Sequence, residues 1–107
     1  MRHPHLSEIL TSLRQHLETL YGDRLAKVVL YGSQARGDAT INSDIDILVT
    51  LNSAFDYVTE VDRTTPFIAD LCLDQEILIS VAFAPDRHFS ETQTPFFMNL
   101  RREGVLA

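Results

Sequence analysis

The sequence has little of what builds disulfide-bonded, zinc-binding or membrane-spanning proteins. Cys72 is its one cysteine, which excludes a disulfide within the chain and a cysteine-rich zinc site, and suits a reducing compartment. No apolar run approaches the roughly 20 residues needed to span a bilayer. Residues 1–5 lack the basic-then-apolar order of a signal peptide. We therefore expect a cytoplasmic protein without a membrane partner.

Basic residues are also scarce. The 9 Lys and Arg residues stand against 15 Asp and Glu, so the formal net charge is −6. A molecule of this charge does not attract a nucleic-acid backbone over long range, so a nucleic-acid partner is not expected. The 4 histidines are scattered and form no cluster with metal-ligand spacing. A histidine metal site is therefore not expected either.

What is present is the composition of an ordinary globular domain. Hydrophobic residues make up 45% of the chain and charged residues 22%, far from the balance that keeps chains disordered. A length of 107 residues leaves no room for two independent cores. We expect one domain over residues 1–107.

Hydrophobic periodicity predicts an α+β fold with a mixed sheet. The expected elements are a helix over 6–20, strands over 27–31, 45–51 and 76–84, a short helical turn over 33–36, a helical region from 58 to about 73, and a last helix with Thr94 as N-cap that ends before Gly104. Pro4 is expected in the first turn of the first helix. Because proline removes a backbone donor, Pro66 predicts either a kink or two consecutive helices.

Two aspartates follow a polar segment at the start of the second predicted strand. Asp44 and Asp46 alternate along that strand, so their side chains share one face while Ile45 and Ile47 enter the core. Two like charges this close repel, and a folded protein tolerates them mainly when a cation neutralises both. Magnesium commonly binds one or two carboxylates together with substrate phosphates, so it is the natural candidate.

The turn after the first predicted strand can hold those phosphates. Gly32 lets the backbone approach an anion closely, and Ser33 adds a hydroxyl donor at the start of the short helix. Arg36 can add a fixed positive charge or simply lie in solvent. Ser43 either shapes the turn before the second strand or joins the nucleotide site.

These residues carry a family resemblance. Gly-Ser, then ten residues, then Asp-x-Asp resembles the signature of the DNA polymerase β-like nucleotidyltransferase superfamily, and Gly-Ser-Gln-Ala-Arg-Gly with Ser-Asp-Ile-Asp looks like its minimal (MNT) branch. The segment 30–49 carries the specific match. The first helix and the closing Asn-Leu-Arg-Arg-Glu-Gly-Val resemble the family more loosely. The resemblance implies the minimal nucleotidyltransferase fold.

The resemblance also implies roles for individual residues. Gly32 and Ser33 would grip the triphosphate of ATP or another nucleotide, while Asp44 and Asp46 would hold up to two magnesium ions. Family members usually carry a third carboxylate on the next strand, at the position that we assign to Ser80, and serine cannot supply its charge. Glu76 shares strand parity with Ser80, but four residues along a strand is about 13 Å, too far to meet the same ions without a bulge.

The implied activity is transfer of a nucleoside monophosphate, with AMP the expected group, to a protein hydroxyl. Minimal members often act beside a helical HEPN partner as the antitoxin of a toxin–antitoxin pair, so such a partner is expected here. The alternative is a catalytically weakened module that binds nucleotide or partner and acts by occupying a surface. A small-molecule modifier ranks lower, since the sequence supplies no acceptor-binding domain. The sequence leaves a homo-oligomer open.

Overall fold

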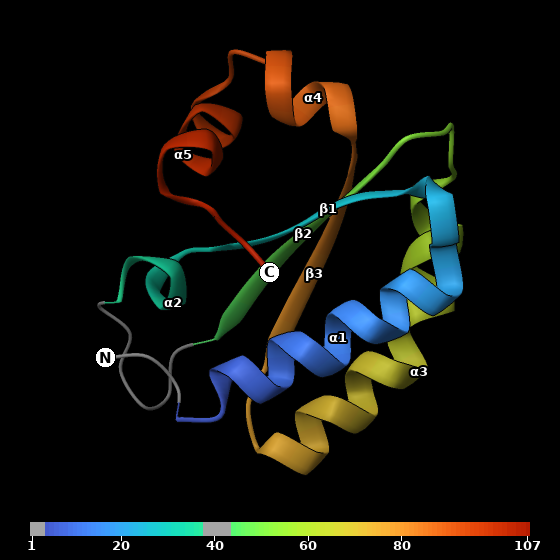
Figure 1. Ribbon diagram of the computed structural model, residues 1–107, viewed down its shortest axis with the longest axis vertical. Helices are drawn as coiled ribbons and strands as arrows, with labels where there is room; N and C mark the ends of the chain where they lie inside the picture. The colour runs from blue at the N-terminus through green and yellow to red at the C-terminus, as the bar shows by residue number, and fades with distance from the viewer. Residues whose placement is uncertain (1–3, 38–43) are drawn as a thin grey trace.

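The computed structural model describes residues 4–37 and 44–107. In chain order its elements are α1 (Leu6–Tyr21), a short 3-10 turn η1 (Gly22–Arg24), β1 (Leu25–Tyr31), α2 (Ser33–Arg36), β2 (Ile45–Leu51), α3 (Tyr57–Gln75), β3 (Ile79–Pro85), α4 (Asp86–Glu91), α5 (Pro95–Glu103) and β4 (Val105–Leu106). Figure 1 shows α1 and α3 together on one side of the strands and α4 and α5 on the other.

The described strands form one mixed sheet in the order β3-β2-β1-β4. β1 runs antiparallel to both β2 and β4, whereas β2 and β3 are parallel and are joined by the crossover helix α3. Parallel neighbours require such a crossover, while antiparallel neighbours do not. The predicted α+β fold with a mixed sheet is confirmed.

One face of the sheet packs against α1 and α3. The three- and four-residue spacing of apolar residues in α1 places Ile9, Leu13 and Leu17 in one buried stripe, each at most 1% exposed. They meet the inward-facing residues of the strands, such as Ile45 and Ile47 of β2, which are fully buried. This face holds the larger of the two hydrophobic clusters.

The opposite face of the sheet is covered only in its middle. A small cluster there joins Val29, Leu48 and Ala84 of the strands to Leu100 of α5. Because side chains alternate along a strand, the polar residues that share this face lie at its two ends. One end carries Asp46 and the other carries Thr50, whose hydroxyl donates to Asp86 of α4.

Several predicted elements occur where the sequence placed them. β2 and α2 have the predicted bounds, and α1 extends one residue beyond the predicted helix. Gly22 ends α1 with a φ of 55°, in the left-handed region. The Thr94 side chain caps α5 by accepting from the Phe97 backbone N–H, with Pro95 at the first helical position. These local signals were sufficient because each acts within one turn of chain.

Pro66 does not divide the third helix. α3 runs as one helix of 19 residues through it, so of the two predicted outcomes, a kink or two consecutive helices, the second is wrong. In the preceding turn the hydroxyls of Thr64 and Thr65 donate to the backbone carbonyls of Glu60 and Val61. Among the described residues, no helix has the length and apolar character to cross a membrane.

Other boundaries differ from the prediction. β3 begins at Ile79, because the chain between it and α3 is turned by Glu76 in the left-handed conformation with a φ of 53°. Pro4 precedes α1, whose N-cap is His5, so it does not lie in the first turn. The short elements α4 and β4 were not predicted, since neither is long enough to display a hydrophobic period.

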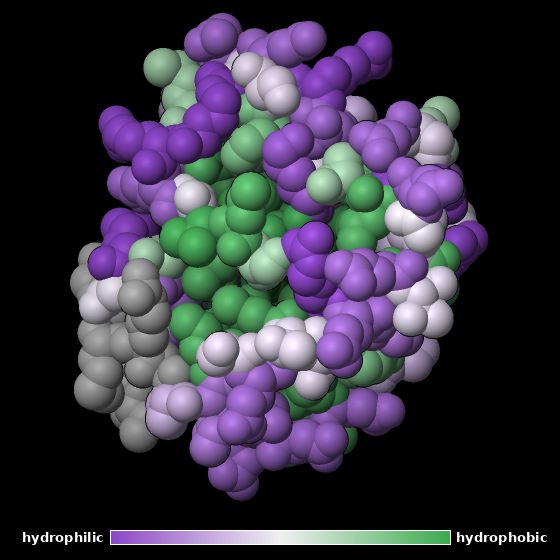
Figure 2. Space-filling view, in the orientation of Figure 1, coloured by the Kyte–Doolittle hydropathy of each residue, from purple (hydrophilic) through white to green (hydrophobic). Residues whose placement is uncertain are grey.

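β4 leaves an apolar edge on the molecule. Val105 is 44% exposed and Leu106 is 65% exposed. Figure 2 shows hydrophobic side chains gathered in the middle of the view, between the two helical layers and around the C-terminus. A two-residue strand covers only Val29 and Leu30 of β1, so most of that strand's outer edge is not paired by β4.

Candidate active site

Three neighbouring strands bring one polar row together. Asp46 of β2 is paired in register with Tyr31 of β1 on one side and with Ser80 of β3 on the other. All three residues lie on the α5 side of the sheet, because they alternate with residues of the large core cluster. Asp44 precedes β2 by one residue and belongs to the same alternating set. The row therefore places the end of β1, where the glycine-led turn begins, beside the Asp-x-Asp motif at the start of β2.

Gly32 lies directly against the Asp46 carboxylate. Its backbone has a φ of 75° and a ψ of −157°, a combination adopted almost only by glycine. A Cβ atom added to Gly32 would lie 2.5 Å from Oδ2 of Asp46, so a side chain there would require the Asp46 carboxylate to move. Gly32 then opens α2, and its carbonyl accepts from the backbone N–H groups of Ala35 and Arg36. The glycine-led turn and the second aspartate thus meet in space.

The charges around Asp46 oppose its ionisation. Partial burial raises the pKa of Asp46, the negative charge of Asp44 raises it further, and the positive charge of Arg36 offsets part of this rise. The pKa of Tyr31 is also raised, first by burial and then by the charge of Asp46. Asp44, Asp46 and Tyr31 therefore form one electrostatically coupled group, in which additional positive charge would be stabilising.

The donors of this site suit a hard divalent cation. Across residues 4–37 and 44–107, no Lys, Arg or His nitrogen lies within ion-pair distance of Asp44 or Asp46. Two neighbouring carboxylates that no described cation pairs with offer the oxygen ligands that magnesium prefers. In the same part of the chain no group of three His, Cys, Asp or Glu side chains is arranged to hold a metal.

The expected third carboxylate is absent from the row. Ser80 stands directly beside Asp46 on the next strand, as its assignment to that position requires. Glu76 cannot be placed on the same strand face as Ser80 by alternation, because it lies before β3 and not within it. It therefore does not replace the third carboxylate in this way. A pair of carboxylates is therefore what the described chain supplies to a metal from this face.

Two other predicted residues have different outcomes. The Arg36 guanidinium contacts the carboxylate of Glu103 in α5 at 3.5 Å, so it links α2 to the last helix. Ser43 lies outside the described residues. The sequence did not predict that α5 reaches the Gly32 turn, although the closing motif that resembles the family contains Glu103.

A small cavity of about 200 Å³ lies where α5 meets that turn. It is lined by Tyr31 and Gly32 at the end of β1, by Arg36 of α2, and by side chains of α5 that include Phe96 and Asn99. It adjoins the polar row, because Tyr31 and Gly32 belong to both. Sequence spacing gave no signal for it, since its walls come from two segments, residues 31–36 and 96–103, that are far apart in the chain.

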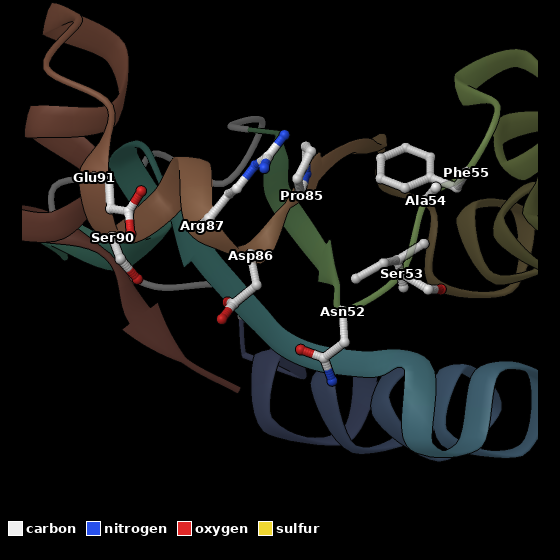
Figure 3. Close-up of a pocket in the computed structure, with 10 residues that line it drawn as sticks. Asn52, Ser53, Ala54, Phe55, Pro85, Asp86, Arg87, Ser90 and Glu91 are labelled. Carbon is white, nitrogen blue, oxygen red and sulfur yellow. The ribbon is translucent and has the colours of Figure 1, made fainter.

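A larger cavity, of about 730 Å³, lies at the opposite end of the sheet. It is formed by the residues that follow β2, such as Asn52 and Phe55, and by the start of α4, and Figure 3 shows them around the opening. Leu51 at its edge is five residues from Asp46 along β2, roughly 16 Å away. Its carboxylate Asp86 is already paired with Lys27 at 2.7 Å. Size alone therefore does not make it the catalytic centre.

Comparison with protein families decides the broader identity. The model of the nucleotidyltransferase domain matches residues 7–91, which include the turn, both aspartates and Ser80. The chain belongs to the nucleotidyltransferase domain family. The match begins in α1 and ends with α4, so this family covers the whole crossover unit on which the polar row is built.

Relatives of this nucleotidyltransferase domain occur in the archaeon Methanocaldococcus jannaschii. The chain is 32% identical over 98 residues to "Putative protein adenylyltransferase MJ0141", and the match covers 92% of this chain and 94% of that protein. It is 50% identical over 44 residues to "Putative protein adenylyltransferase MJ0604". That second match covers 41% of this chain and 44% of the relative, so it spans less than half the relative's length.

Solved structures share the fold of this nucleotidyltransferase domain. A nucleotidyltransferase structure from Sulfolobus solfataricus superposes with a TM-score of 0.65 at 18% identity, covering 92% of this chain and 76% of that one. A structure described as a toxin-antitoxin with AMP-PNP superposes with a TM-score of 0.60 at 18% identity, covering 89% of this chain and 69% of that one. At this identity the likeness establishes the fold, and the predicted nucleotidyltransferase family is confirmed.

Proposed function

We propose that this nucleotidyltransferase domain binds a magnesium nucleoside triphosphate, ATP in the first place, and transfers AMP to a hydroxyl group of a partner protein. The observation that carries the proposal is the contact between Gly32 and the Asp46 carboxylate. It joins a phosphate-binding turn to a carboxylate pair that no described side chain neutralises. A bound magnesium ion would supply charge neutralisation of the triphosphate and of the developing transition state.

The residues of the chain would act mainly by positioning. Asp44 and Asp46 would hold the metal, while Gly32 and Ser33 would let the backbone approach the phosphates without a side chain between them. The acceptor oxygen would form a bond to the α-phosphorus, the bond from the α-phosphorus to the bridging oxygen of pyrophosphate would break, and the hydroxyl proton would pass to solvent. Arg36 would contribute positive charge at the edge of the site.

The protein acceptor rests on the relatives. Both Methanocaldococcus relatives are named as protein adenylyltransferases, and two of the structural neighbours are toxin–antitoxin assemblies. We therefore propose a partner protein as acceptor, with a helical HEPN-type toxin as its form. The chain would then be the antitoxin of the pair.

Ser80 favours a second candidate function. A site with two carboxylates in place of three binds a metal less strongly, since ligand charge sets the affinity of such sites. A chain of this kind can act by holding nucleotide or partner without transferring a group. The position of Ser80 beside Asp46 is the observation that favours this weakened module.

Incubation with α-³²P-labelled ATP, magnesium and the candidate partner separates the two functions. Transfer of label to the partner that is lost in Asp44→Asn supports the enzyme. Binding of MgATP without label on any partner contradicts the enzyme and supports the module. In the same assay Ser80→Asp restores a carboxylate to the row, so appearance of transfer only in this variant would attribute the defect to Ser80.

A further inference from the structure

We propose that the small cavity between α5 and the Gly32 turn binds the nucleobase of the triphosphate, and that Asn99 and Glu103 select adenine. This inference rests on the proposed function, because it assigns the base of a nucleotide whose phosphates lie at the neighbouring turn. The cavity adjoins the polar row through Tyr31 and Gly32, so one ligand can reach both.

The size and walls of the cavity suit a flat ring. Its volume of about 200 Å³ is below the roughly 300–1,000 Å³ of sites that enclose a whole small ligand. Tyr31 and Phe96 form an aromatic corner, with ring centroids 5.8 Å apart and planes at 87°. Leu100, which is 2% exposed, closes the bottom. Proteins that bind unpaired bases commonly stack them on aromatic side chains of this kind.

The polar groups of the cavity argue against its holding the phosphates. Glu103 places a carboxylate in the wall, which would repel a triphosphate. That carboxylate is held by Arg36 at 3.5 Å and by Arg102 at 3.6 Å. A neutral ring that donates a hydrogen bond meets no such repulsion. The anionic part of the nucleotide therefore belongs on the Asp46 side of Gly32, where a metal can neutralise it.

Asn99 and Glu103 together present one donor and one acceptor. The Asn99 Oδ1 atom accepts from Arg102 Nη2 at 2.7 Å, and since arginine only donates, this contact fixes which end of the amide is the oxygen. The Asn99 NH₂ group remains to donate, while Glu103 accepts. Adenine carries a ring nitrogen acceptor beside its amino donor, which is the complementary pair.

The test compares two ligands that share the polyphosphate and differ in the base. Binding of Mg-ATP and of magnesium tripolyphosphate is measured by calorimetry on the whole chain. We expect Phe96→Ala to weaken Mg-ATP roughly 5- to 100-fold, the range found when one base–aromatic stack is removed, and to leave tripolyphosphate unchanged. Asn99→Ala should weaken Mg-ATP without affecting tripolyphosphate. Met98→Ala is the control, because Met98 lies on the same helix, is 50% exposed and does not line the cavity.

A second ligand, inosine triphosphate, tests whether Asn99 and Glu103 select adenine. Inosine triphosphate replaces the amino donor of ATP by a carbonyl oxygen that would face Glu103, so we expect it to bind at least several-fold more weakly than ATP to the wild type. Equal affinity for the two would overturn the assignment of adenine. Glu103→Gln should narrow the difference, since an amide can donate to the carbonyl.

The other outcomes separate this inference from the proposed function. Equal weakening of both polyphosphate ligands in Phe96→Ala would overturn the base site while nucleotide binding stands. Unchanged Mg-ATP binding with a raised KM for the acceptor protein would overturn it too, and would assign the cavity to an acceptor side chain. If the wild type binds neither ligand, the proposed function fails and the inference falls with it.

Discussion

Asp46 and Asp86 lie on the same face of the sheet, at its two ends, and their surroundings are opposite. Asp86 accepts from the Lys27 ammonium at 2.7 Å and from the Thr50 hydroxyl at 2.9 Å, and these contacts lower its pKa despite the opposing effect of burial. Asp46 has Asp44 beside it and a raised pKa. The protein neutralises Asp86 from within, whereas in the described part of the chain no cationic side chain forms an ion pair with Asp46.

The strand register explains how one face of the sheet carries both carboxylates, Asp46 and Asp86, in different surroundings. Lys27 pairs with Thr50 at one end, and Tyr31 pairs with Asp46 at the other, with the row of Val29 and Leu48 between them. The small apolar cluster under α5 separates the two polar ends. A stabilising ion pair and the proposed metal site can therefore coexist on one surface without competing for partners.

The largest expected effect tests the functional end. We expect Asp46→Asn to lower AMP transfer about 1000-fold, because metal-bound charge stabilisation contributes several kcal/mol and each 1.4 kcal/mol is about tenfold in rate. The free energy of unfolding without divalent cations should not fall, since the substitution removes repulsion from Asp44. Transfer assays and urea denaturation measure the two quantities.

The matched control for that experiment is Asp86→Asn. It removes the same charge from the same face and should retain AMP transfer. If both variants lose transfer to the same extent, the difference drawn between the two ends of the sheet is wrong.

Gly32→Ala should have the next largest effect. The backbone of Gly32 costs a non-glycine residue on the order of 1–3 kcal/mol, and the new Cβ would displace the Asp46 carboxylate. We expect a loss of stability of that size by urea denaturation and a loss of AMP transfer of more than about tenfold. Gly22→Ala is the control, because Gly22 also has a positive φ but has nothing within 4 Å of an added Cβ. Equal transfer in the two variants would contradict a role for the Gly32 contact.

Asp86→Asn tests the contribution to stability of the other end of the sheet, where Asp86 is paired. It removes the carboxylate charge that accepts from the Lys27 ammonium and the Thr50 hydroxyl, so we expect the free energy of unfolding to fall by about 1–2 kcal/mol at pH 7. Glu91→Gln, on the exposed side of the same helix, should change stability by no more than about 0.5 kcal/mol. An Asp86→Asn variant as stable as the wild type would remove the distinction between paired and unpaired carboxylates.

The smallest expected effect is the pH dependence of that same contribution. Because the folded pKa of Asp86 lies below its ordinary value of 3.8, its contribution is complete well above that value and is lost as the pH falls through the folded pKa. The difference in stability between wild type and Asp86→Asn should therefore be constant from about pH 7 to pH 5 and shrink below about pH 4. Denaturation curves at several pH values measure it. A difference that grows on acidification would contradict the sign.

Local patterns predicted much of the fold. The stripe of leucines in α1, the cap of α5 by Thr94 and the extent of β2 each depend on neighbours within a few residues, and each was predicted. The predicted division of the third helix at Pro66 is wrong, because a proline removes one backbone donor only and α3 continues on both sides of it. The short α4 and β4 show no hydrophobic period of their own. They depend on contacts with the rest of the molecule.

The sequence by itself determined the family, the mixed fold and the spacing between the Gly32 turn and the strand at whose start Asp44 and Asp46 lie. Only the tertiary structure decided which carboxylate is paired and which helix reaches the turn. Strand alternation and helix periodicity are local, so they can be read along the chain. Register between strands and the docking of α5 join residues far apart in sequence, and these are fixed by packing of the whole molecule.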